Sequence, residues 1–76
     1  MKELLEMIAK SLVDEPQEVV VEQDNIEDGL LLKLAVAPDD MGKVIGKQGK
    51  RAKALRTIMK AVSVRNDTNV TVEITE

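Results

Sequence analysis

Residues 42–53 read GKVIGKQGKRAK, a stretch in which glycines and cations crowd together. Gly46 and Gly49 stand on either side of two long polar residues, Lys47 and Gln48. Because glycine has no side chain, it permits a tight turn and lets another backbone come close. Backbone N–H groups at the start of a following helix favour a negative group. The stretch therefore predicts a turn between two helices that a phosphate can approach.

The residues around this turn indicate a helix on each side. Met41, Val44 and Ile45 form the apolar side of a short helix, which Asp39 and Asp40 are suited to cap. After Gly49 a longer helix carries apolar residues at helical spacing, namely Leu55, Ile58, Met59 and Val62. Asn66 to Asn69 is expected to be a turn.

Farther out, the patterns predict one more helix and three strands. A helical stripe over 1–13 contains Leu5, Ile8, Ala9 and Leu12, widened by Leu4 and Met7, and ends before Pro16. Alternation predicts strands over 17–23, with Val19 and Val21 inward, and over 30–37, with Leu32, Leu34 and Val36 inward. A polar turn over 24–29 joins them. In the last strand Val70, Val72 and Ile74 alternate with Thr71, Glu73 and Thr75.

The predicted element order is αββααβ, and each strand is apolar on one face only. Such a sheet requires one layer of helices. The fold class is therefore α+β, with a three-stranded sheet covered on one face by three helices. No linker or repeat divides the chain, so residues 1–76 are expected to form a single domain. The patterns leave the strand order open.

Missing residue types exclude several kinds of chemistry. The chain has no Cys, His, Phe, Tyr or Trp. Disulfides, Cys/His zinc sites, thiol nucleophiles and histidine bases are therefore excluded, and neither catalysis nor a cofactor nor a metal is expected. The chain has no aromatic ring that could stack on a base, so it would have to bind nucleic acid through another kind of contact. The charged N-terminal segment is unlike a signal peptide and no stretch has membrane-spanning length, so a cytoplasmic protein is expected.

Charge is strongly segregated along the chain. The whole sequence has a net charge of −3, yet residues 41–66 hold eight cations and no carboxylate. The segment thus carries +8 and the remainder −11. One interpretation is that these cations are only the solvent-exposed side of an amphipathic helix. A helix stabilised by its own charges usually mixes signs at i, i+4 spacing, however, so an external anion is the favoured partner.

Nucleotide-binding motifs do not match this glycine pair. A P-loop would need glycine at Met41 and a hydroxyl at Gln48, and a dinucleotide fingerprint would need glycine at Val44. A plain helix-turn-helix corner stays open, because glycine pairs at helix junctions are common.

Residues 44–50, read with their flanking elements, resemble the GXXG signature of KH domains. The likeness covers the whole chain: the element order is similar to the type II KH arrangement, and the length is similar to the small single-domain bacterial proteins of the KhpA family. The resemblance implies non-catalytic binding of about four nucleotides of single-stranded RNA, with the backbone clamped at GXXG. The implied role is an RNA chaperone or post-transcriptional regulator.

Carried over residue by residue, the resemblance assigns Gly46, Lys47, Gln48 and Gly49 to the clamp. The cations that would flank the phosphates are Lys43, Lys50, Arg51 and Lys53. In KH domains the bases lie on an aliphatic groove, for which the candidates are Val44, Ile45, Leu34 and Val36. Core packing is an equally open interpretation for each of these four.

Protein partners are also implied. The resemblance suggests a homodimer, or a heterodimer with a larger KH-containing RNA-binding protein. Val20, Leu31 and Ala35 face outward in the predicted sheet and could meet such a partner, so a protein-interaction module is the alternative function. A carrier with a prosthetic group on Ser11 or Ser63 is a third class, although neither serine lies in an Asp-Ser-Leu type of loop.

Overall fold

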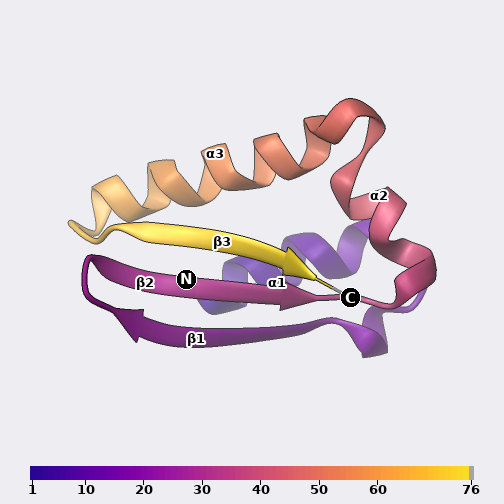
Figure 1. The fold of residues 1–76 in the computed structure, drawn as a ribbon, viewed down its shortest axis with the longest axis horizontal. Helices are drawn as coiled ribbons and strands as arrows, with labels where there is room; N and C mark the ends of the chain where they lie inside the picture. The colour runs from indigo at the N-terminus through magenta and orange to yellow at the C-terminus, as the bar shows by residue number, and fades with distance from the viewer. Residues whose placement is uncertain (76) are drawn as a thin grey trace.

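The computed structural model describes residues 1–75 and has the expected order of helices and strands (Figure 1). The helices are α1 (Lys2–Leu12), α2 (Met41–Ile45) and α3 (Lys50–Arg65), and the strands are β1 (Val20–Ile26), β2 (Gly29–Ala35) and β3 (Val70–Thr75). Short 3₁₀ turns lie at η1 (Pro16–Glu18), η2 (Pro38–Asp40) and η3 (Lys47–Gly49).

The three strands form one sheet in the order β1-β2-β3. β1 and β2 pair antiparallel as a hairpin, whereas β2 and β3 pair parallel. A parallel pair needs a long crossover, and here α2 and α3 supply it. In Figure 1, α3 runs alongside β3 and the GXXG segment lies at the far end of α3 from the start of that strand. β3 is consequently an edge strand with α3 beside it.

The core lies between one face of the sheet and the helices. The buried side chains that pack there are Leu5, Ala9, Val19, Val21, Leu32, Leu34, Val36, Val44, Leu55, Met59 and Val72. The α+β class with helices on one face is thereby confirmed. On the opposite face, which we call the open sheet face, Val20 is 51% exposed.

The hairpin differs from its prediction at both ends. Pro16, with its fixed φ, opens a 3₁₀ turn, so the strand expected from Gln17 begins only at Val20. The strand then continues to Ile26, which pairs with Gly29 across a two-residue turn. The turn expected over 24–29 is therefore too long, because pairing with Leu31 and Leu30 outweighs the turn preference of Asp24 and Asn25.

The buried stripe of α3 is rotated from the one expected. Ala52, Leu55, Met59 and Ser63 are buried, whereas Ile58 is 43% exposed. The stripe includes two small residues that the apolar pattern did not single out. Ser63 tolerates burial because its hydroxyl donates to the Lys60 carbonyl at 2.7 Å.

The hairpin tip is locked to the turn between α3 and β3. The Leu30 N–H donates to the Asn69 carbonyl at 2.8 Å. Gly29 has φ +144, and a Cβ there would lie 2.0 Å from the Asn69 oxygen. Only glycine permits this approach.

Gly29→Ala should therefore lower the free energy of unfolding by about 3 kcal/mol, because the new methyl group meets backbone that cannot move away and the φ is strained. Gly42→Ala is the matched control: nothing lies within 4 Å of a Cβ there, and alanine in a helix should add about 0.5 kcal/mol. Urea denaturation measures both variants. Equal effects would contradict this account of the hairpin tip.

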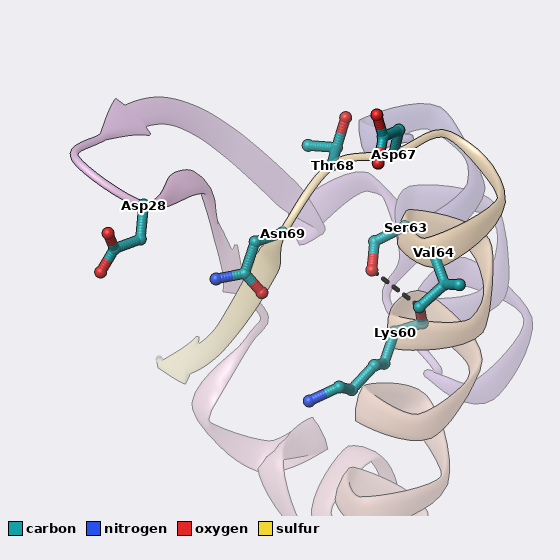
Figure 2. A pocket seen from close by; sticks show the side chains of 7 residues that line it. All are labelled: Asp28, Lys60, Ser63, Val64, Asp67, Thr68 and Asn69. Atoms are coloured by element: carbon teal, nitrogen blue, oxygen red, sulfur yellow. Dashed lines mark hydrogen bonds between the residues drawn. The ribbon is translucent and has the colours of Figure 1, made fainter.

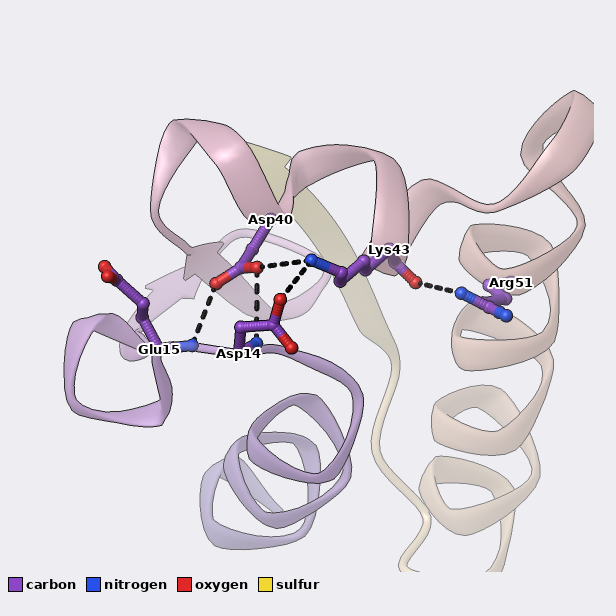
Figure 3. Close-up of polar contacts among 5 residues, drawn as sticks. All are labelled: Asp14, Glu15, Asp40, Lys43 and Arg51. Carbon is purple, nitrogen blue, oxygen red and sulfur yellow. Dashed lines mark hydrogen bonds and ion pairs between the residues drawn. The ribbon is translucent and has the colours of Figure 1, made fainter.

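Asp40 ties α2 to the segment that follows α1. Although Asp40 is the N-cap residue of α2, its side chain makes no capping bond, so the capping prediction for Asp40 is wrong. Its carboxylate, 1% exposed, instead accepts the N–H groups of Asp14 at 3.2 Å and Glu15 at 3.1 Å. Lys43 donates to Asp40 at 3.4 Å and also to Asp14 (Figure 3). These bonds replace the water that the buried carboxylate has lost.

The same contacts set the ionisation of this cluster. Burial by itself would raise the pKa of the Asp40 carboxyl, but the two N–H donors and the Lys43 ammonium outweigh burial and hold that pKa below its ordinary value. The hydrogen bond to Asp14 is the main cause that raises the pKa of Lys43. Both groups are therefore more stable in their charged forms here than in the unfolded chain.

Asp40→Asn should show a pH-dependent loss of stability. Because the folded-state pKa lies below the ordinary 3.8, the stability from this carboxylate is fully present above that value and is lost as the pH falls through the folded-state pKa. The variant should unfold at a lower temperature than the original chain at about pH 7, and the difference between the two unfolding temperatures should narrow as the pH falls below 3.8. A gap of constant size would show that the charge of Asp40 is irrelevant.

Candidate nucleic-acid interface

Residues 46–49, hereafter the GXXG loop, form a tight corner between α2 and α3. Gly46 has φ 76 and ψ 174, and its N–H donates to the Gly42 carbonyl at 2.9 Å. A Cβ at Gly46 would lie 2.8 Å from Cγ and 3.0 Å from the backbone nitrogen of Arg51. Both the positive φ and this contact require glycine, so the first glycine allows α3 to begin directly against the end of α2.

The second glycine faces open space. Gly49 has φ 76, yet a Cβ there would meet nothing within 4 Å. Gln48 beside it also has a positive φ, of 57. The outer side of the GXXG loop is therefore a bare, left-handed stretch of backbone that another chain can approach.

The N-terminus of α3 carries no negative charge of its own. Gly49 is its N-cap residue, no side chain caps it, and its first turn contains no acidic residue. The Lys47 carbonyl accepts the N–H of Lys50, but the dipole of this 16-residue helix places a partial positive charge at the GXXG loop. An anion at this corner would meet a positive field.

The cations predicted to flank the loop divide into two groups. Lys47, Lys50 and Lys53 are exposed, as is Gln48, and within residues 1–75 these lysines form no ion pair. The structure brings them together at the loop and along the start of α3.

Lys43 and Arg51 have structural contacts instead. Lys43 is paired with Asp14 and Asp40, and Arg51 Nη1 donates to the Lys43 carbonyl at 2.8 Å (Figure 3). Arg51 also packs against Gly46. Both side chains hold the loop between its two helices, in contrast to the free lysines.

The predicted aliphatic groove is mostly core. Val44 and Leu34 are 0% exposed and Val36 is 4% exposed, so these three present almost no surface to a base. Only Ile45 is half-buried. The structure therefore has Val44, Leu34 and Val36 in the core, which was the alternative interpretation.

An accessible groove lies elsewhere, between α3 and the edge strand. The α3–β3 groove is lined by Arg56, Lys60, Val70, Thr71 and Val72. Sequence reasoning missed it because the strand order decides which strand lies beside α3. A signal was present: Lys53, Arg56 and Lys60 are spaced by three and four residues, which places them on one helix face.

Within residues 1–75 the structure contains neither a cluster of metal-ligating side chains nor a membrane-spanning helix. No three carboxylates, or other metal-ligating side chains, come close enough to hold a metal ion. No helix in that range is both long and apolar enough to cross a membrane.

Comparison with known proteins identifies the family. The family model described as KhpA/KhpB, KH domain, matches residues 2–74. RNA-binding protein KhpA of Clostridium acetobutylicum is 60% identical over 74 residues, covering 97% of this chain and 99% of the relative. RNA-binding protein KhpA of Clostridium perfringens is 55% identical with the same coverage.

A solved structure shows the same fold. Era from Aquifex aeolicus superposes with a TM-score of 0.66 at 22% identity, over 97% of this chain and 29% of the Era chain. The GXXG loop, the type II order of elements and the full-length matches agree. The chain therefore belongs to the KhpA/KhpB family of KH domains.

Proposed function

We propose that this chain binds single-stranded RNA without catalysis, holding the sugar-phosphate backbone at the GXXG loop. The observation that carries the proposal is the bare corner at Gly49, which faces open space at the positive end of α3. Exposed Lys47, Lys50 and Lys53 surround that corner without internal partners among residues 1–75. The names of the relatives, RNA-binding protein KhpA, support the same function.

The bases would lie in the α3–β3 groove. Arg56 and Lys60 form one wall, and the edge strand β3 forms the other with Val70 and Val72. An edge strand has backbone N–H and C=O groups available for the hydrogen-bonding edges of bases. An arginine guanidinium can stack on a base in place of an aromatic ring. The groove thus provides a mode of recognition that a chain without aromatic residues can use.

The loop and the groove are continuous along α3. Ten residues separate Lys50 from Lys60, and a rise of 1.5 Å per residue makes that distance about 15 Å. Such a track suits a short segment of a few nucleotides. The charge of −11 outside residues 41–66 should keep affinity modest. Because Lys47, Lys50 and Lys53 would contact phosphates, affinity should also fall as salt rises. Modest, salt-sensitive binding fits an RNA chaperone or a post-transcriptional regulator, the role we assign.

Pairing with another protein is the second candidate function. Val20 is 51% exposed and Leu31 is half-buried on the open sheet face. This face lies across the sheet from α3, so a second copy or a larger KH-containing protein could dock there while the GXXG loop holds RNA. Dimerisation and RNA binding are therefore compatible.

A double substitution in the loop tests RNA binding. Lys47→Asp with Gln48→Asp should reduce affinity for unstructured oligoribonucleotides at least about tenfold, because two carboxylates would face the phosphates. Fluorescence anisotropy at low salt measures affinity, and circular dichroism should be unchanged.

The control for this test has the same change of charge at a distance. Lys2→Asp with Gln17→Asp also removes three units of charge, but these residues lie in α1 and η1. This control should keep most of the affinity. If the two double variants lose affinity equally, binding depends on net charge alone and the GXXG loop is not the site.

A further inference from the structure

A second cavity opens at the end of α3 that is far from the GXXG loop. This hairpin-tip cavity is lined by Asp28, Lys60, Ser63, Val64, Asp67, Thr68 and Asn69 (Figure 2). It shares Lys60 with the α3–β3 groove, and Asn69 directly precedes Val70 of that groove. An RNA strand that follows the groove away from the loop would therefore reach this cavity next.

The two turns that line the cavity are joined through their backbones. The Leu30 N–H bonds to the Asn69 carbonyl at 2.8 Å, and Gly29 is too close to Asn69 for any side chain. Asp28 lines the cavity from the hairpin tip and Asn69 from the turn before β3, while Lys60 extends from α3 (Figure 2). Within residues 1–75 neither Asp28 nor Lys60 forms an ion pair.

The charges of the cavity differ from those of the GXXG loop. The loop has cations without carboxylates, whereas the cavity combines Lys60 with the carboxylates of Asp28 and Asp67. A phosphate would be repelled by the carboxylates. An ionised carboxylate only accepts hydrogen bonds, so its best partners on RNA are the amino groups of bases.

We propose that the hairpin-tip cavity is a base-recognition subsite that selects a nucleobase with an exocyclic amino group over uracil. Asp28 accepts a hydrogen bond from the amino group, and the Asn69 amide or the Lys60 ammonium donates to an adjacent ring nitrogen or carbonyl oxygen. The inference rests on the proposed RNA binding and names the specificity of that site.

Cytosine and uracil show the selection most clearly because they have the same ring. Cytosine presents an amino donor beside two acceptors, which matches one carboxylate beside the two donors of the cavity. Uracil presents a carbonyl oxygen where cytosine has its amino group, so that oxygen would face the carboxylate of Asp28. A site built to hydrogen-bond one group rejects an analogue that lacks it, because its polar groups are left unpaired.

Binding of two short RNAs tests the subsite. The chain should bind hexacytidylate about fivefold more tightly than hexauridylate at low salt, a conservative value for one base contact. Asp28→Asn should bring the ratio close to one, because asparagine can donate to the uracil carbonyl as well as accept. Glu27→Gln removes the same charge from the same turn outside the cavity lining, and it should leave the ratio unchanged.

The outcomes separate the subsite from the proposed function. A ratio near one in the original chain, or the same ratio after Asp28→Asn, overturns the subsite while RNA binding stands. Loss of the preference in Glu27→Gln as well would show a general charge effect and also overturns it. If neither hexamer binds, the proposed function itself fails, and the subsite fails with it.

Discussion

The contact between Gly46 and Arg51 is the constraint on which the rest of the structure depends. Because Gly46 has a positive φ and no Cβ, only four residues need to separate the end of α2 from the start of α3, with Arg51 packed against the corner. Arg51 then bonds to the Lys43 carbonyl, and Lys43 pairs with Asp40 and Asp14. The corner is thereby braced from within, so that Gly49 and the N-terminus of α3 can be left bare on the outside.

This bracing explains why cations near the loop have different roles. Lys43 and Arg51 bond to carboxylates and a carbonyl of the protein, whereas Lys47, Lys50 and Lys53 are exposed and form no ion pair among residues 1–75. Some of the eight cations in residues 41–66 therefore stabilise the fold, and others are available to a ligand. An acidic protein can present a local field to RNA in this way, provided that its carboxylates lie away from the loop.

Sequence periodicity was sufficient to predict the helices and strands but not the α3–β3 groove. Strict alternation in residues 70–75 and the helical stripe through Leu55 and Met59 depend on local spacing, so those elements were predicted correctly. The α3–β3 groove depends on β3 pairing parallel at the edge of the sheet, which no local pattern contains. For the same reason Val44 was a candidate base contact, although it is 0% exposed and belongs to the core.

RNA binding at the GXXG loop is tested most directly by titrating the isotope-labelled chain with an unstructured hexaribonucleotide at low ionic strength and following the backbone amide resonances. We expect the resonances of residues 46–50 and 70–72 to shift together as RNA is added. The resonances of Glu22 and Lys33, which lie on β1 and β2, should stay in place. Shifts confined to β1 and β2, with residues 46–50 unmoved, would contradict RNA binding at the GXXG loop.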